Sequence, residues 1–313
     1  MSSQSYVEYT IKNGVAYITI NRPEAMNALN PTVVEQLEKA FTDAENDTGV
    51  KGIAFCGVGK AFIAGADIKF FLENVKSGNL EPNITFTVDG HKLLRRFETC
   101  KKPTVAVVAG LSLGGGSEVA LACQAIVGTD KASFAFPEAG IGIYPGLGGM
   151  IRTARMLGND LAKYYITTGK TIRAGDAAAL GIITKMADID GIEGAVEQIV
   201  LNGAPDKYAN PGAPAEYDHI AASMAGGGLK KLLSGEIPAG IDEEFAKTTA
   251  SILAAKSPRA LKFIDEIMDA QAKVSIDEAI QIELGSLVEM YSTKDALAGL
   301  SMPPGQKAEF TGE

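Results

Sequence analysis

Residues 103–128 read PTVAVVAGLSLGGGSEVALACQAIVG, which is the longest apolar run in the chain. Glu118 and several glycines interrupt this run, so it lacks the unbroken apolar length of a membrane-spanning helix. We expect instead a short buried strand at Thr104–Ala109, then a tight glycine loop and a buried helix. A continuously apolar strand of this kind is typical of a sheet that is covered on both faces.

Strands and helices alternate on either side of this run. Val15–Ile20 and Ile53–Phe55 are rich in β-forming residues and predict two further strands. Asn30 followed by Pro31 predicts the start of a helix, with an N-cap and a first-turn proline. The apolar residues at helical spacing that follow are Val33, Leu37, Ala40, Phe41 and Ala44. Glycines crowd the strand-to-helix connections, where ligands of α/β proteins bind.

The C-terminal part of the chain is predicted to be helical. Ser257-Pro258 opens one helix, and Ser275 with Glu278 forms a capping box at the start of another. The expected apolar face of that second helix consists of Ile276, Ile280, Leu284, Leu287, Val288 and Tyr291.

The segment from Gly203 to Gly240 is rich in glycine and proline and cannot carry much regular helix. It is either a surface excursion or a lid that shapes the substrate site. We therefore divide the chain into an α/β core (1–202), an insertion with its connecting segment (203–256) and a helical region (257–313).

Composition and charge limit the partners. The 313 residues are 46% hydrophobic and carry a net charge of −9, which repels nucleic acid and anionic membrane surfaces. The N-terminus lacks the basic and apolar regions of a signal peptide, so we expect a cytoplasmic protein. Cys56, Cys100 and Cys123 show no metal-binding spacing, and we expect reduced, mostly buried thiols and no metal site.

Two glutamates in glycine-rich frames carry the predicted chemistry. Glu118 ends Gly110-Leu-Ser-Leu-Gly-Gly-Gly-Ser-Glu118, and Glu138 lies in Phe134-Ala-Phe-Pro-Glu138-Ala-Gly. A carboxylate buried in an apolar, glycine-lined setting is costly and usually functional. The helix that starts near Ser117 directs free amides at a developing negative oxygen, and the Ala64–Asp67 turn supplies a second donor. This pattern indicates acid–base chemistry beside an oxyanion hole, as needed to form and quench an enolate.

Two other kinds of site fit the sequence less well. Gly140–Gly149 does not match G-x-G-x-x-G and follows no clear strand, so we interpret it as a tightly packed loop beneath the next helix. The chain has no G-x-S-x-G elbow, which argues against a hydrolase. Both histidines, His91 and His219, have polar neighbours, so we expect them at the surface.

Four segments together resemble the crotonase family in order and spacing, and most of all its enoyl-CoA hydratases. They are Asn21-Arg-Pro-Glu-Ala-Met-Asn-Ala-Leu29, Ala61-Phe-Ile-Ala-Gly-Ala-Asp-Ile-Lys69, Gly110–Glu118 and Phe136-Pro-Glu-Ala-Gly-Ile-Gly142. The resemblance implies an α/β spiral of ββα turns with a C-terminal helical trimerisation region. It also implies an assembly of homotrimers or of hexamers made from two trimers.

The same resemblance implies roles for individual residues. The amides of Ala66 and Gly115 would form the oxyanion hole for an acyl-CoA thioester. Glu118 and Glu138 would be the catalytic pair for adding water across the double bond of a 2-enoyl-CoA. Coenzyme A is then part of the substrate, and no metal or redox cofactor is needed.

The resemblance further implies a CoA-binding surface, formed by Ala25, Met26, Ala64, Asp67, Ile68 and Lys69. Two of these residues have a simpler alternative. Asp67 fits the N-cap of the next helix, and Lys69 fits an exposed lysine at a helix start. Glu24 stands where relatives often carry a basic residue, which would weaken a phosphate contact.

Two alternatives to a hydratase stay open. A Δ3-Δ2 enoyl-CoA isomerase, or another crotonase acting on a bulkier or cyclic acyl-CoA, resembles the same motifs, although the isomerase needs only the carboxylate at Glu138. A non-catalytic CoA-ester-binding subunit on the same scaffold has no need for two costly carboxylates. The Gly203–Gly240 insertion and the tail Gly299–Gly305, which lacks the family's basic ending, depart from the family pattern.

Overall fold

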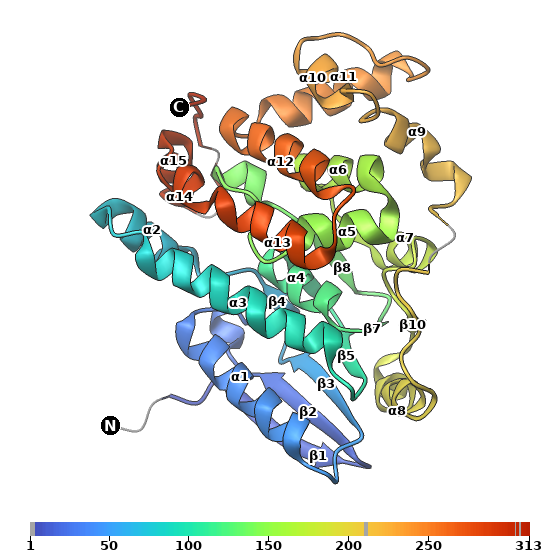
Figure 1. Ribbon diagram of the computed structural model, residues 1–313. Coiled ribbons are helices and arrows are strands. Elements are labelled where there is room, and N and C mark those ends of the chain that lie inside the picture. The colour runs from blue at the N-terminus through green and yellow to red at the C-terminus, as the bar shows by residue number, and fades with distance from the viewer. Residues whose placement is uncertain (1–3, 210–211, 304, 307) are drawn as a thin grey trace. The chain divides into compact units, whose positions relative to one another are not determined.

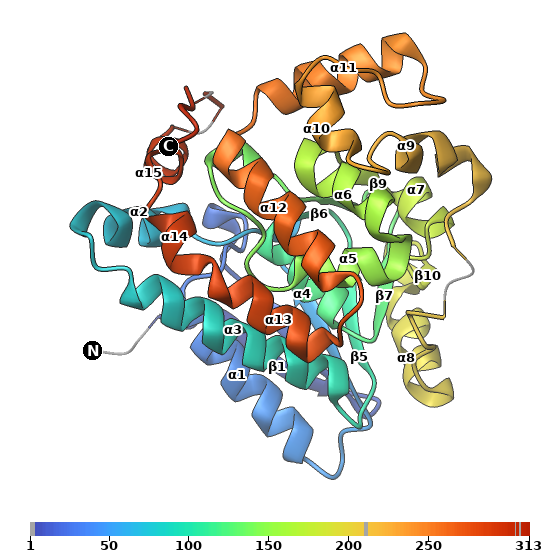
Figure 2. The same ribbon diagram turned by 45° about the horizontal axis from the view of Figure 1, so that its top comes forward.

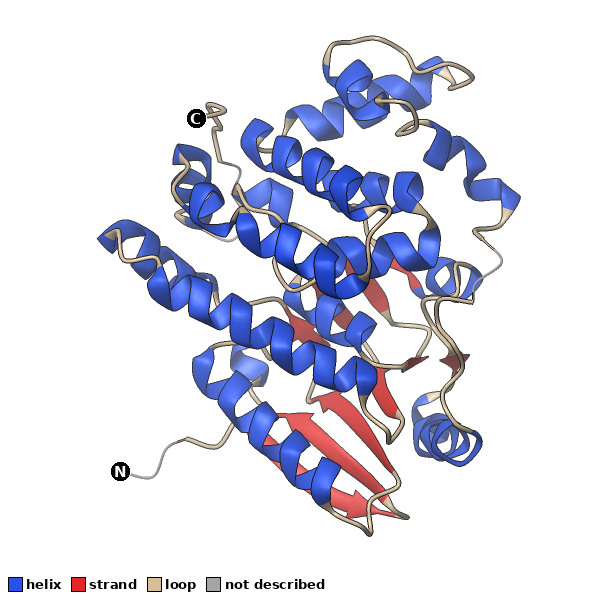
Figure 3. Ribbon diagram, in the orientation of Figure 1, coloured by secondary structure: helices blue, strands red, loops and turns tan. Residues whose placement is uncertain are grey.

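The computed structural model describes residues 4–209, 212–303, 305–306 and 308–313, and Figure 1 gives their element order. The chain folds into two compact units that interleave along the sequence. The first unit takes in Met1–Asp67, Asp89–Phe134 and Ile172–Ala209, and the second takes in Ile68–Val88, Ala135–Thr171 and Asn210–Glu313. Figure 3 colours the strands red and the helices blue. The described strands belong to the first unit, except for Ala135, the last residue of the strand Ser133–Ala135. The rest of the described second unit consists of helices and loops.

Two sheets organise the first unit. Within the described residues, a six-stranded sheet has the order β1-β2-β3-β5-β7-β10, and a four-stranded sheet has the order β4-β6-β8-β9. In the larger sheet β1 and β2 are antiparallel, and the other pairs are parallel. Its strands are β1 (Val7–Lys12), β2 (Val15–Ile20), β3 (Gly52–Gly57), β5 (Thr104–Val108), β7 (Ala125–Gly128) and β10 (Lys185–Met186). The smaller sheet consists of β4 (Ala61–Ala64), β6 (Leu111–Leu113), β8 (Ser133–Ala135) and β9 (Ile172–Arg173).

Strand β5 is buried on both faces, and so is most of β3, as their continuously apolar sequences predicted; β1 at the edge is exposed. Successive side chains of a strand point to opposite faces. Phe55 therefore packs on one face against Phe97 of α3 (Glu81–Thr99), with ring centroids 4.3 Å apart. Ala54 joins the opposite core with Val196 of α8 (Ile192–Asn202).

Helix α1 (Pro31–Asn46) forms as its sequence predicted and lies against β1 and β2 (Figure 1). The Asn30 side chain accepts a hydrogen bond from the backbone amide of Val33 at 2.9 Å and so caps the helix. The buried residues of α1 are Val33, Leu37, Ala40, Phe41 and Ala44, which confirms the predicted face. The other short helices of this unit are η1 (Pro23–Ala25), α4 (Gly115–Ala122), α7 (Ala174–Ala179) and η3 (Ile189–Gly191).

Helices α5, α6, α12 and α13 pack together in the second unit, and α12 contacts both α6 and α13 (Figure 2). An ion pair is buried between α6 and α12, where the Lys163 Nζ lies 2.7 Å from the Asp265 carboxylate. The helices of this unit, with α3 shared, are α2 (Ile68–Ser77), η2 (Glu138–Ile141), α5 (Gly149–Leu157), α6 (Asn159–Thr168), η4 (Ala215–Tyr217), α9 (Asp218–Ala222), α10 (Gly228–Leu233), α11 (Glu243–Ala254), α12 (Pro258–Gln271), α13 (Ile276–Gly285), α14 (Leu287–Tyr291) and α15 (Lys294–Leu300).

The two C-terminal helices begin where the sequence predicted, but the apolar face predicted for the second of them is wrong in part. Ser257 caps α12, and Ser275 with Glu278 forms the capping box of α13. The single helix predicted after Ser275 is broken around Ser286 into α13 and α14. Val288 is 55% exposed, although it was expected to be buried, because the buried stripe passes instead through Leu287 and Met290.

Glu283 is buried, which is uncommon for a charged side chain. Its Oε1 accepts a hydrogen bond from the backbone amide of Gly148 at 2.8 Å, and its backbone carbonyl accepts one from the Tyr144 hydroxyl at 2.7 Å. These contacts tie the Gly140–Gly149 loop to α13. The interpretation of this loop as a packed structural element is confirmed.

The insertion contains short helices, in line with its composition. Its described residues form η4, α9 and α10, of which the longest has six residues; Asn210 and Pro211 lie outside the described residues. Among the described residues, no helix is long and apolar enough to span a membrane.

The histidine prediction is half right. His219 is exposed, but His91 is buried with 2% exposure. The polar neighbours of His91 are misleading because helical spacing, and not adjacency, decides its face: α3 buries Leu94 and Phe97 on the same side. Cys100 and Cys123 are buried and Cys56 is half-buried, and all three are free thiols.

Candidate active site

The Ala64–Asp67 turn of the first unit is fastened to the turn that precedes α1. The Ala64 amide donates to the Met26 carbonyl at 3.0 Å, and the Leu29 amide donates to the Gly65 carbonyl at 2.9 Å. The Asp67 amide completes the connection by donating to the Leu29 carbonyl at 2.7 Å. These bonds use the Gly65 carbonyl and the Asp67 amide on either side of Ala66, but within the described chain the Ala66 amide has no protein acceptor.

Asn27 holds the same turn together, a role that the sequence did not predict. Its side chain is fully buried, and its Nδ2 donates to the carbonyls of Val58, Ala61 and Phe62 at 3.0, 2.8 and 3.2 Å. Its φ is +60°, a left-handed value that asparagine tolerates better than most residues. An asparagine in the Met26-Asn-Ala turn could therefore have indicated a left-handed residue that holds this turn.

The N-terminus of α4 lies directly beside the Ala66 turn. A Cβ added to Gly116 would lie 1.9 Å from the Ile63 carbonyl oxygen, so only glycine lets this helix approach β4 so closely. A Cβ added to Gly115 would lie 3.7 Å from the Ala66 nitrogen. Gly115 is the first residue of α4, and its amide also has no protein acceptor in the described structure. The two amides predicted to bind an oxyanion are therefore brought close together and are both available.

Glu118 lies in the first turn of α4 and is only 2% exposed. Its backbone amide donates to the Gly114 carbonyl at 3.0 Å, and Ser117 Oγ donates to the Ser112 carbonyl at 2.7 Å, which fixes the start of the helix. The positive end of the helix dipole favours a negative charge in this turn. The first unit thus combines a buried glutamate with two free amides, one at the start of α4 and one in the neighbouring Ala64–Asp67 turn.

Glu138 begins the η2 turn of the second unit and is 8% exposed. Burial raises the pKa of its carboxyl to about 8, against the opposing effect of its own backbone amide, which donates a hydrogen bond to it. Its Oε2 is buried without a hydrogen-bond partner among the described residues. A carboxyl that changes protonation near neutral pH suits a general acid or base.

The residues predicted to bind CoA are divided between the units. Ala25, Met26, Ala64 and Asp67 lie in the first unit, around the hydrogen bonds that fasten the Ala66 turn. Ile68 and Lys69 begin α2 in the second unit, and both are exposed.

Asp67 directly precedes α2, and its carboxylate has a partner that the sequence did not reveal. The Arg22 Nη2 donates to the Asp67 Oδ2 at 2.9 Å, and Arg22 also donates to the Ala28 carbonyl at 3.0 Å. Arg22 therefore connects Asp67 to the turn that holds Ala66. Glu24, which is exposed, lies 3.9 Å from the same guanidinium.

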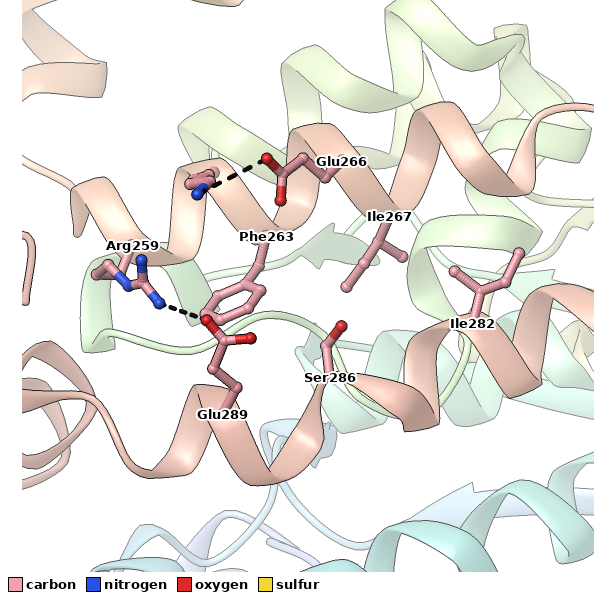
Figure 4. A pocket seen from close by; sticks show the side chains of 8 residues that line it. Arg259, Phe263, Glu266, Ile267, Ile282, Ser286 and Glu289 are labelled. Carbon is pink, nitrogen blue, oxygen red and sulfur yellow. Dashed lines mark hydrogen bonds and ion pairs between the residues drawn. The ribbon is translucent and has the colours of Figure 1, made fainter.

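A surface pocket of about 280 Å³ lies between α12 and the α13–α14 segment, and no predicted site residue is among those that line it (Figure 4). Charged side chains that pair with one another line much of it: Arg259 with Glu289 at 2.7 Å, and Lys262 with Glu266 at 3.9 Å. Among the described residues, no group of three or more His, Cys, Asp or Glu is placed to bind a metal ion.

The fold and the first-unit site define an α/β protein with free amides and a buried carboxylate where a strand meets a helix. Residues 15–303 match the enoyl-CoA hydratase/isomerase family. The chain belongs to this family, which confirms the resemblance to the crotonases.

Similar proteins support this membership. The chain is 36% identical over 195 residues to a short-chain-enoyl-CoA hydratase of Clostridium acetobutylicum, covering 61% of this chain and 73% of that protein. It is 28% identical over 308 residues to a probable enoyl-CoA hydratase of Bacillus subtilis, covering 98% and 99% of the two chains. The crystal structure of a carnitinyl-CoA dehydratase from Mycobacterium thermoresistibile is similar, with a TM-score of 0.80 and 25% identity, covering 95% and 88% of the two chains. These likenesses confirm the predicted fold class.

Proposed function

We propose that this protein is an enoyl-CoA hydratase, a hydro-lyase that reversibly adds water across the 2,3 double bond of a 2-enoyl-CoA thioester. The observation that carries the proposal is the pair of free amides, Ala66 and Gly115, beside the buried Glu118. Relatives named as enoyl-CoA hydratases support the same reaction.

The amides of Ala66 and Gly115 would donate hydrogen bonds to the thioester oxygen. These bonds strengthen as the oxygen gains negative charge in the enolate, so they lower the barrier to addition. No metal is required for this step, because preorganised amides stabilise the charge.

Glu118 and Glu138 would act as the acid–base pair. Glu118 accepts a proton from water while the water oxygen forms a bond to Cβ, and electrons of the double bond move to the thioester oxygen. Glu138 then delivers a proton to Cα as the enolate collapses. The proton left on Glu118 returns to Glu138 through exchange, so the net change is the addition of one water molecule. The pKa of about 8 for Glu138 supports its role as the acid near neutral pH.

We also propose that Ala25, Met26, Ala64, Asp67, Ile68 and Lys69 contact the CoA portion, which is part of the substrate. We further propose a homotrimer or a hexamer of two trimers in the cytoplasm. Sedimentation of the purified protein tests the assembly: a monomer at micromolar concentration would contradict it.

Steady-state hydration of crotonyl-CoA tests the reaction. Loss of the conjugated-thioester absorbance should be rapid for the wild type and should fall by ~100-fold or more in Glu118→Gln and in Glu138→Gln. Circular dichroism of each variant should match the wild type, because glutamine keeps the shape of the side chain.

The same variants separate the alternatives. An isomerase would convert a 3-enoyl-CoA and keep its activity in Glu118→Gln, because one carboxylate at Glu138 is enough to move a proton. A non-catalytic subunit would bind CoA esters without turnover. Either result would contradict the hydratase proposal.

A further inference from the structure

Ser257 connects the turn that carries Glu138 to the rest of the second unit. The Ser257 backbone amide donates to the carbonyl of Ala139, the residue after Glu138, at 3.0 Å. The Ser257 Oγ accepts from the Ala260 amide at 3.0 Å as the N-cap of α12. The same Oγ donates to the Asp295 Oδ2 at 2.6 Å. Ser257 is completely buried, so water does not compete for these bonds.

Asp295, in the first turn of α15, is the buried end of this network. It is 1% exposed, and its Oδ1 accepts from the backbone amides of Thr311 and Gly312 at 2.8 and 3.1 Å. One hydroxyl and two amides therefore satisfy the carboxylate. A buried carboxylate is costly unless it is satisfied in this way, which indicates that its position matters.

Helix α15 also packs against the end of η2 with no spare room. Gly142 has a φ of +80°, and a Cβ added there would lie 2.2 Å from the Asp295 carbonyl oxygen. The backbone of Asp295 therefore contacts one end of the turn, and its side chain reaches the other end through Ser257. Any shift of Asp295 would move η2.

We propose that Asp295, acting through Ser257, is a positioning residue that fixes the η2 turn and so aims the Glu138 carboxyl. This inference rests on the proposed function only for the role of Glu138. The Glu138 Oε2 has no partner in the described structure, so the backbone turn has to set its direction. A misplacement of about 1 Å can cost a catalytic group ~100-fold in rate.

Asp295→Asn and Ser257→Ala test the proposal. In both, kcat for crotonyl-CoA hydration should fall by roughly 10-fold or more while KM changes by less than about 3-fold, because the acid and not the binding surface is displaced. The pKa of Glu138, about 8 in the wild type, should fall as water reaches the loosened turn. Carbon-13 NMR of labelled glutamate carboxyls, with Glu138→Gln to identify the signal, measures this titration.

Ser275→Ala is the matched control. Ser275 caps α13 as Ser257 caps α12, because its Oγ accepts from the Glu278 amide at 3.2 Å. The variant therefore loses a cap of the same kind but leaves Ser257, Asp295 and α15 unchanged. We expect a loss of stability without a change in kcat or in the Glu138 titration.

The NMR titration keeps the two proposals separable. If the wild type hydrates no 2-enoyl-CoA, the proposed function fails, yet the carboxyl titration still tests the positioning role. An unchanged Glu138 pKa together with an unchanged kcat in Ser257→Ala would overturn the role of this network. Ser257→Ala keeps the backbone bond to Ala139, so it carries the test if Asp295→Asn does not fold.

Discussion

Glu118 and Glu138 are both buried, but the structure supports them in different ways. Glu118 is placed by backbone packing, because α4 approaches β4 at a glycine that tolerates no side chain. Glu138 sits on a four-residue turn that is bonded to the Ser257 backbone amide, and the Ser257 side chain is in turn bonded to Asp295. The comparison shows that the first support depends on the absence of a Cβ, whereas the second depends on a polar network.

The largest effect is expected at Gly116. In Gly116→Ala the new Cβ would lie 1.9 Å from the Ile63 carbonyl oxygen, so the helix or the strand has to move. We expect a loss of about 3 kcal/mol or more in the free energy of unfolding, the scale of strong overpacking. Urea denaturation measures it.

Gly115→Ala is the control for that prediction. Its nearest contact would be an ordinary 3.6 Å, so it should fold like the wild type. Equal destabilisation by the two alanines would mean that close backbone approach does not support Glu118.

The next effect is a pH dependence caused by Glu138. Its folded pKa of about 8 lies above the ordinary 4.5, so folding favours the protonated carboxyl. The stability it contributes is complete below pH 4.5 and is lost as the pH rises to about 8. Relative to Glu138→Gln, the wild type should therefore lose roughly 2 kcal/mol between pH 6 and pH 8. Thermal unfolding of both proteins at the two pH values measures this, and parallel curves would contradict the burial effect.

A smaller effect is expected at the C-terminal end of α4. The Lys207 Nζ donates to the carbonyls of Leu121 and Cys123 at 2.6 and 3.1 Å and lies 3.1 Å from the Glu98 carboxylate. Lys207→Met would remove this donor from the Leu121 and Cys123 carbonyls and the cation from beside Glu98, and should cost about 1–2 kcal/mol. The control is Lys247→Met, which removes an exposed pair with Glu243 and should cost under about 0.5 kcal/mol. Equal losses would show that Lys207 does not hold the helix.

The smallest effect is expected at Glu24, which is exposed on η1. If the CoA phosphates bind near this turn, Glu24→Lys should tighten CoA binding by roughly 2-fold, as is usual for exposed charges. Calorimetric titration with CoA at low salt measures the change. If the affinity for CoA does not increase, the CoA phosphates do not bind near this turn.

The sequence predicted the features that depend on neighbouring residues. The Asn30 cap, the buried face of α1 and the Ser275–Glu278 capping box all follow from local spacing. The glycine frames of Glu118 and Glu138 likewise predicted burial, because glycine marks close approach of the backbone. These signals were sufficient for an alternating α/β chain and for two buried carboxylates, whereas the crotonase-like fold class was implied by the family resemblance.

The features that the sequence did not predict depend on contacts between distant segments. Glu283 is buried where it accepts a bond from the remote Gly148, and the apolar Val288 is exposed because the buried stripe passes beside it. The Asp295 network joins residues from three separate segments, and no local pattern marks it. Buried polar residues with remote partners are the kind of feature that sequence periodicity cannot reveal.

Hydration itself can be followed by the oxygen atom it transfers. Crotonyl-CoA would be incubated with the wild type in oxygen-18 water, beside Glu118→Gln, and the thioester product analysed by mass spectrometry. The proposed mechanism predicts one oxygen-18 at Cβ of the wild-type product and at most a small fraction of that rate in the variant. A wild type that moves the double bond or binds the thioester without incorporating oxygen-18 would contradict hydration by the two glutamates.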